Sequence, residues 1–133
     1  MNTNGTAKYR QNLPQLNGEF FLTDGGIETT LIFQEGFELP EFAAFNLLKQ
    51  AEGVEALRRY YKTYASIAQS HGVGFILEAP TWRTSSVWGE KLGYSPEALE
   101  NVNRQAVALL EDIRHEYEKE LTKIVISGNI GPR

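Results

Sequence analysis

Three short apolar runs alternate with amphipathic helical stretches, and this alternation constrains the fold more than any other feature of the chain. Strands are predicted over residues 20–23, 73–77 and 123–127. A helix is predicted over residues 53–70, and a second opens at Ser95, with proline and an acid in its first turn. Apolar strands separated by long helices pair in parallel through right-handed crossovers. We therefore expect an α/β fold with a parallel βαβαβ order.

The composition argues against several classes of protein and of binding site. A formal charge of -4 and scattered Lys and Arg residues argue against nucleic acid as a partner. No apolar run reaches 18 residues, so no membrane span is predicted. The absence of cysteine removes disulfides and thiolate metal sites and makes the cytoplasm the expected compartment. Residues 1–18 are predicted to be a flexible leader, and residues 19–133 to be the folded portion.

Each predicted strand ends in a polar loop that contains glycine or proline. These loops are Asp24-Gly25-Gly26, Glu78-Ala79-Pro80 and Ser127-Gly128-Asn129. The carboxyl ends of parallel strands meet at one edge of a sheet, where α/β proteins bind their ligands. The sequence therefore predicts a ligand site at this edge.

The first two loops offer candidate ligand groups. Asp24 is suited to accept hydrogen bonds from a ligand's ammonium group, although an Asx-turn or a helix cap would explain it equally. Gly25 and Gly26 admit unusual backbone angles and close approach of a ligand. Glu78 is either a ligand contact or base, or the partner of Arg83 in a structural ion pair, and we favour the ion pair.

Other residues that often carry chemistry are given structural interpretations. Trp82 and Trp88 are expected to pack on the neighbouring helix, although they are also suited to form a pocket wall. His71 and His115 are expected on the surface. No cluster of His, Cys, Asp and Glu has the spacing of a metal site, and there is no Walker A, G-x-G-x-x-G or nucleophile-elbow motif.

Three segments resemble the homocysteine S-methyltransferase family. Residues 24–31 are similar to that family's D-G-G-x-G-T-x-L opening, residues 80–85 to its T-x-T-F-x-A-S segment, and residues 128–133 to its G-x-I-G-P signature. The segments occur in the family's order and cover nearly all of the chain from about Phe20. Glu28 stands where the family usually has glycine, and Trp82 replaces the usual phenylalanine.

The resemblance implies a TIM (β/α)8 barrel of roughly 300 residues. Only its first strands lie in this chain, so the barrel is incomplete. Family members transfer a methyl group to the thiol of homocysteine, which gives methionine. They hold the homocysteine sulfur on a zinc ion ligated by three cysteines from later strands, and zinc generates the attacking thiolate.

The family's first loop holds the amino-acid end of homocysteine. The matching residues here are Asp24, Gly25 and Gly26, and we add Thr29 and Glu78 as substrate-binding candidates. Zinc is expected for the complete family enzyme, but no residue of this chain is expected to ligate it or to be catalytic. The methyl donor stays open among S-methylmethionine, S-adenosylmethionine, betaine and a folate or cobalamin carrier.

Two main hypotheses follow. The chain is the N-terminal segment of a homocysteine S-methyltransferase-like enzyme and is inactive alone, or it is a stand-alone, non-catalytic α/β binding or interaction module that self-associates through its open sheet edges. A third hypothesis is an α/β enzyme of different chemistry that uses Glu78 and Asp24 as acid and base.

Overall fold

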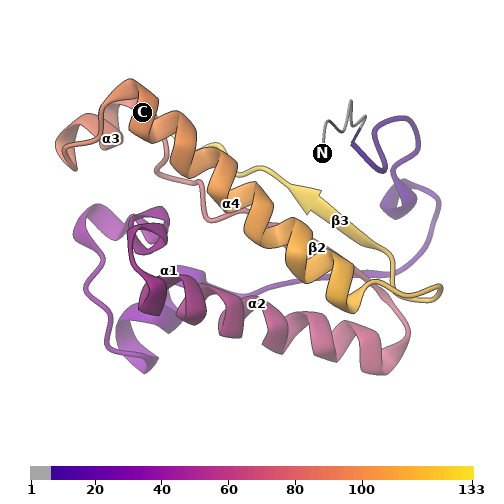
Figure 1. The fold of residues 1–133 in the computed structure, drawn as a ribbon. Coiled ribbons are helices and arrows are strands. Elements are labelled where there is room, and N and C mark those ends of the chain that lie inside the picture. Colours follow the sequence, from indigo (N-terminus) through magenta and orange to yellow (C-terminus); the bar gives the residue numbers. More distant parts are fainter. Residues whose placement is uncertain (1–6) are drawn as a thin grey trace.

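The computed structural model describes residues 7–133, and three parallel strands form its centre (Figure 1). The strands are β1 (Phe21–Thr23), β2 (Gly74–Glu78) and β3 (Ile124–Ser127), in the spatial order β1-β2-β3. Both neighbouring pairs are parallel, with Phe75 opposite Leu22 and opposite Ile124. The predicted α/β class and the parallel βαβαβ order are confirmed.

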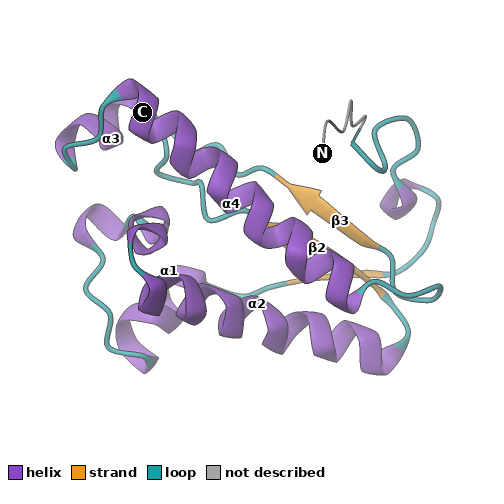
Figure 2. Cartoon of the chain, viewed as in Figure 1, coloured by secondary structure: helices purple, strands orange, loops and turns teal. Residues whose placement is uncertain are grey.

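Two long helices, α2 (Ala51–His71) and α4 (Pro96–Tyr117), lie side by side on one face of this sheet (Figure 2). Gly72 ends α2 in the left-handed conformation, with φ of 62°. The Ser95 hydroxyl accepts a hydrogen bond from the Ala98 N–H at 3.1 Å, which confirms the predicted N-cap of α4. Because all three strands run parallel, their carboxyl ends open toward the same edge of the sheet.

The core lies between the sheet and these helices. Phe75, Leu77 and Ile124 point toward α2 and α4 and are fully buried. The opposite face of the sheet is less covered, since Thr23 is exposed and Ile76 and Ser127 are part-exposed. Within residues 7–133, therefore, only one face of the sheet has a complete helical layer.

Several short helices complete the fold. They are η1 (Pro14–Leu16), α1 (Ile27–Thr29), η2 (Thr30–Gln34), η3 (Pro40–Phe42), η4 (Ala44–Lys49) and α3 (Ser86–Lys91). Phe45 and Leu48 of η4 are buried, so this irregular segment packs on the core. Neither α1 nor α3 was predicted, because each is too short to show helical periodicity.

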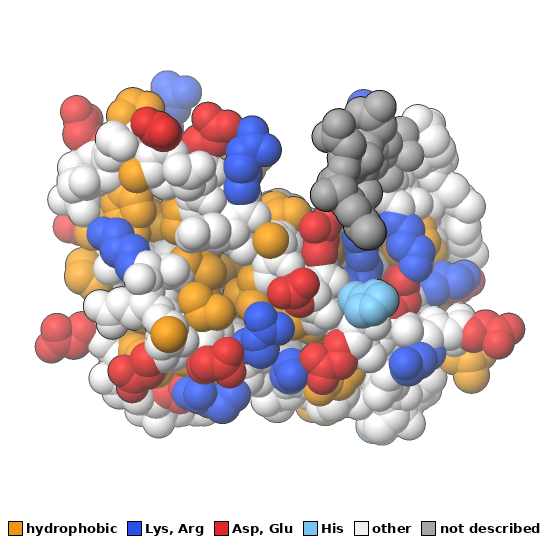
Figure 3. Space-filling view, viewed as in Figure 1, with side chains coloured by type: hydrophobic (Ala, Val, Ile, Leu, Met, Phe, Trp, Pro, Cys, Tyr) orange, Lys and Arg blue, Asp and Glu red, His pale blue; other side chains and the backbone are white. Residues whose placement is uncertain are grey.

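The outer surface of the helices is charged with both signs interspersed (Figure 3). Lys62 of α2 pairs with Glu116 of α4 at 2.9 Å. Ile67 of α2 is 44% exposed, because α2 buries the face that carries Tyr61 and Ala65.

The predicted leader falls partly outside the described residues, which begin at position 7. Within it, Lys8 and Tyr9 both bond to Glu118 at the end of α4, and the Tyr9 Oη–Glu118 Oε2 distance is 2.7 Å. Burial and the Glu118 carboxylate raise the pKa of Tyr9 to about 12. The flexibility predicted for the leader stays a prediction.

Candidate functional site

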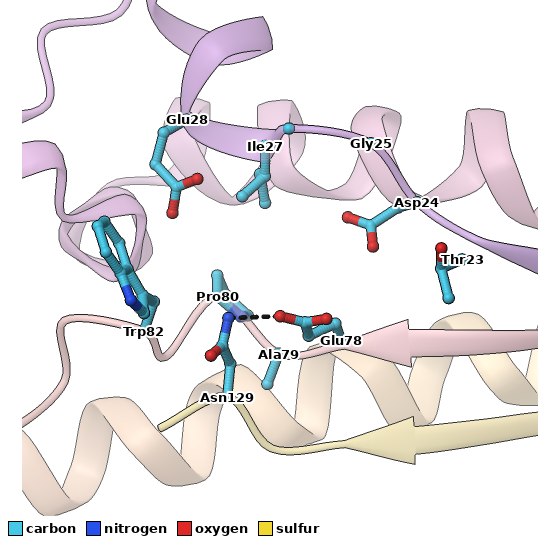
Figure 4. A pocket seen from close by; sticks show the side chains of 11 residues that line it. Thr23, Asp24, Gly25, Ile27, Glu28, Glu78, Ala79, Pro80, Trp82 and Asn129 are labelled. Atoms are coloured by element: carbon cyan, nitrogen blue, oxygen red, sulfur yellow. Dashed lines mark hydrogen bonds between the residues drawn. The ribbon is translucent and has the colours of Figure 1, made fainter. Parts of the chain in front are cut away.

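The loops that follow the three strands form an open pocket of about 430 Å³ (Figure 4). Its lining joins residues far apart in the sequence, as the parallel topology requires. The lining residues are Thr23, Asp24, Gly25, Gly26, Ile27, Glu28, Glu78, Ala79, Pro80, Trp82 and Asn129. The pocket thus brings together four of the five substrate-binding candidates.

Asp24 is the half-buried acid of the first loop. Its Oδ2 accepts a hydrogen bond from the Tyr60 hydroxyl of α2 at 2.8 Å. Burial raises the pKa of the Asp24 carboxyl, and the Tyr60 hydrogen bond opposes that rise. The helix cap considered for Asp24 is wrong, because Gly26 is the N-cap of α1 and no side chain caps that helix.

Gly25 and Gly26 both line the pocket, and neither has a positive φ. The prediction based on backbone freedom is therefore wrong. A Cβ on Gly25 would lie 2.7 Å from the Tyr64 hydroxyl, so the loop rests directly on α2. A Cβ on Gly26 would lie 3.4 Å from Thr29 Oγ1, its nearest neighbour. Gly25 is therefore held by packing, while Gly26 borders the open pocket.

Glu78 ends β2 and projects into the pocket with its side chain exposed. Its Oε1 accepts a hydrogen bond from the Asn129 side-chain amide, which comes from the loop after β3 (Figure 4). The favoured interpretation, an ion pair with Arg83, is wrong: among residues 7–133 Glu78 forms no salt bridge. The Arg83 guanidinium instead lies between the Trp82 and Trp88 rings, at 4.2 and 3.8 Å from their centroids.

Glu28 and Asn129 were missed as site residues. Glu28, from α1, points its carboxylate across the pocket toward Asn129 (Figure 4). Burial raises the pKa of Glu28, with smaller contributions from Asp24 and Glu78, and Arg83 opposes the rise. The signal for Glu28 was its replacement of a glycine in the first-loop motif, and the signal for Asn129 was its position directly after β3.

The loops after β2 and β3 are joined by backbone and side-chain bonds. The Thr81 hydroxyl donates to the Asn129 carbonyl at 2.8 Å and accepts from the Asn129 N–H at 3.1 Å. The Gly131 N–H donates to the Trp82 carbonyl at 3.1 Å, and a Cβ on Gly131 would collide with Trp82. These contacts fix Trp82 as one wall of the pocket.

Thr29 lies in α1 next to Gly26 but does not line the pocket. His71 and His115 are exposed on helices, as expected.

The lining gives the pocket a negative character. Three carboxylates, from Asp24, Glu28 and Glu78, line the pocket, and the lining contains no Lys or Arg. Such a site favours a small ligand that carries an ammonium or another cationic group. The half-open shape leaves room for a ligand of amino-acid size.

The family model described as homocysteine S-methyltransferase matches residues 21–133. The chain belongs to the homocysteine S-methyltransferase family. No curated protein and no solved structure matches the chain significantly. The match begins at the first residue of β1 and takes in all three pocket loops, so the whole site lies within the family region.

Zinc, which the homocysteine S-methyltransferase family resemblance implies, does not fit the residues of this chain. Among residues 7–133, no group of three or more His, Cys, Asp and Glu side chains could hold a metal ion. The chain also has no cysteine to supply a thiolate.

None of the helices between residues 7 and 133 is both long enough and apolar enough to cross a membrane.

Proposed function

We propose that the pocket at the strand ends recognises the amino-acid end of homocysteine in a methyltransferase that transfers a methyl group to its thiol, giving methionine. The observation that carries the proposal is the convergence of Asp24 and Glu78 on one pocket within the family match. In this proposal the carboxylates bind the homocysteine ammonium group. Gly26 has no side chain, so the ligand can approach the backbone of the first loop closely.

The roles of the individual groups follow from their contacts. Asp24, held by Tyr60, is the proposed primary partner of the ammonium group. Glu78, oriented by Asn129, is the proposed second acceptor. Trp82 supplies an apolar wall for the methylene carbons of the ligand. Thr29 is proposed to support the first loop from α1 rather than to touch the ligand.

Methyl transfer needs more than recognition. The thiol must lose its proton before it attacks the methyl donor, and zinc, which the family resemblance implies, would supply this activation if the complete enzyme holds it. No residue in this chain is proposed to ligate zinc, so the chain alone is proposed to bind homocysteine without catalysing the transfer. The identity of the methyl donor does not enter the proposal.

We further propose that β1, β2 and β3 are the first strands of a (β/α)8 barrel. The order β1-β2-β3 with both crossover helices on one face is the arrangement of successive barrel strands. The part-exposed face that carries Ile76 would then face the barrel interior. The alternative is a stand-alone module whose open sheet edges pair with a second copy.

NMR titration of the chain with L-homocysteine tests the recognition proposal. Amide shifts are expected in residues 24–28 and 78–82, with an affinity on the order of 1 mM, the range of a small polar ligand in an open site. Asp24→Ala and Glu78→Gln are each expected to weaken binding about 10-fold or more. The matched control is Glu97→Gln, which changes an exposed acid at the start of α4. Equal binding by all of these variants would contradict the proposal.

A further inference from the structure

Helix α2 directs three tyrosines toward the ligand edge of the sheet. The Tyr60 hydroxyl donates to Asp24 Oδ2 at 2.8 Å, and the Tyr61 hydroxyl donates to the Glu78 backbone carbonyl at 2.9 Å. The Tyr64 hydroxyl lies against Gly25, where an added Cβ would approach it to 2.7 Å. One helix outside the sheet thus contacts both loops that carry the candidate ligand groups.

The tyrosine rings form a packed group. Tyr60 contacts Tyr61 and Tyr64, with ring centroids 5.3 and 5.1 Å apart. Tyr60 is 3% exposed and Tyr61 is fully buried. Packing between a helix and a sheet needs only apolar side chains, whereas a buried hydroxyl is costly unless it finds a partner. Here the two buried hydroxyls find their partners in the pocket loops, so they link the core to the site.

We propose that Tyr60 is a positioning residue that holds the Asp24 carboxylate in its ligand-facing orientation, and that Tyr61 fixes the end of the strand from which Glu78 projects. The inference rests on the proposed function of the pocket, because it assigns these residues to recognition of a cationic ligand group. An acid already anchored on one oxygen loses less freedom when a ligand binds. The Tyr60 hydroxyl also stabilises the charged form of Asp24 against its burial.

The titration of Asp24 gives a readout that a merely structural role would not move. The titratable groups that face Asp24 are Tyr60, Tyr61 and Tyr64 of α2, Glu28 of α1 and Glu78 of β2. Tyr60→Phe keeps the ring and removes only the hydroxyl. Because that hydroxyl lowers the pKa of Asp24, the midpoint of the Asp24 titration is expected to move to higher pH in Tyr60→Phe.

The experiment compares Tyr60→Phe with Tyr94→Phe. Tyr94 also donates a hydrogen bond at 2.8 Å, to Asn46 Oδ1, but it does not line the pocket. Carboxyl NMR without ligand follows Asp24 across the pH range, and a homocysteine titration at pH 7 measures affinity. Tyr60→Phe is expected to raise the Asp24 midpoint and to weaken binding about 10-fold, the usual result of losing a hydrogen bond to a charged group. Tyr94→Phe is expected to change neither.

The two readouts separate the failure of this inference from that of the proposed function. An Asp24 titration that is unchanged in a folded Tyr60→Phe protein would overturn the positioning role. A shifted titration, with no homocysteine binding by the wild-type chain, would support the positioning role and reject homocysteine as the ligand. If Tyr60→Phe fails to fold, Tyr61→Phe serves as the second variant. It is expected to weaken binding without moving the Asp24 midpoint, and unweakened binding would overturn the role of Tyr61.

Discussion

Asp24 occupies a position where function and stability oppose each other. Its carboxyl is half-buried, burial raises its pKa, and the hydrogen bond from Tyr60 and a backbone hydrogen bond compensate only in part. A protein that used Asp24 only for structure would gain by replacing it with a neutral residue. An acid in this environment is consistent with a ligand that carries the opposite charge.

Asp24→Asn is expected to raise the melting temperature at pH 7 by about 1–3 °C, while it weakens homocysteine binding. The raised pKa means that the folded protein holds the Asp24 proton more tightly than the unfolded chain does. The stability contributed by protonated Asp24 is fully present when the pH is below the pKa of Asp24 in the unfolded chain. It is lost as the pH rises through the pKa of Asp24 in the folded protein. Thermal unfolding of both proteins at pH 3 and pH 7 checks this prediction. The melting temperature of Asp24→Asn should exceed that of wild type at pH 7 but not at pH 3. A melting temperature of Asp24→Asn below that of wild type at pH 7 would contradict the raised pKa of Asp24.

The loops after β2 and β3 act as one unit at the scale of elements. The Thr81–Asn129 hydrogen bonds and the contact between Gly131 and Trp82 join them on one side of the pocket. The G-x-I-G-P resemblance located this loop in the sequence, but the sequence did not show why its second glycine is needed. The structure supplies the reason, since a side chain at Gly131 would separate the two loops.

Gly131→Ala and Gly128→Ala form a matched pair within this loop. A Cβ at Gly131 would collide with Trp82, whereas a Cβ at Gly128 would meet nothing within 4 Å. Gly131→Ala is expected to cost about 1–3 kcal/mol in the free energy of unfolding. Gly128→Ala is expected to stay within about 0.5 kcal/mol of wild type. Urea unfolding followed by tryptophan fluorescence measures both, and equal costs would show that the loops are not held by this contact.

At the scale of the whole molecule, the main feature is that the two faces of the sheet are buried to different degrees. Leu77 faces α2 and α4 and is fully buried, whereas Ile76, the preceding residue of β2, lies on the other face and is part-exposed. In a complete barrel the two residues would both be core. Among residues 7–133 no complete layer covers Ile76, so such a layer would have to come from outside these residues or from a second copy.

Leu77→Ala and Ile76→Ala test this difference. In the isolated chain Leu77→Ala is expected to cost about 3 kcal/mol in the free energy of unfolding, as a cavity in a packed core does. Ile76→Ala is expected to cost about 1 kcal/mol or less, because its side chain is already partly in water. Similar costs for both, together with a dimer in sedimentation, would favour the self-associating module.

Much of the fold could be predicted because continuous apolar strands and capped amphipathic helices leave local signals, as Ser95 and Phe75 do. The pocket could be located from the polar loops after the strands, and Asp24 and Glu78 were found in this way. The partners of these residues could not be predicted. Tyr60 is separated from Asp24 by 36 positions, and among the buried residues of α2 it resembles an ordinary core residue.

The failed ion pair between Glu78 and Arg83 has a similar cause. The two residues are close in sequence, but Trp82 and Trp88 hold the Arg83 guanidinium between their rings. Asn129, distant in sequence, reaches Glu78 instead, because parallel pairing of β2 with β3 brings the two strand ends together. The pairing of the strands in the structure was needed to show that Glu78 contacts Asn129 rather than Arg83.

A charge series of ligands tests the central claim, that the pocket recognises the amino-acid end of homocysteine, most directly. The measurement is an NMR titration of the wild-type chain with three compounds. L-Homocysteine and L-2-aminobutyrate, which lacks the thiol, are both expected to shift the amides of residues 24–28 with similar affinity. The third compound, 4-mercaptobutyrate, keeps the thiol but lacks the ammonium group and is expected to leave these residues unchanged. Binding of 4-mercaptobutyrate equal to that of homocysteine, or shifts confined to residues outside the pocket, would contradict the account.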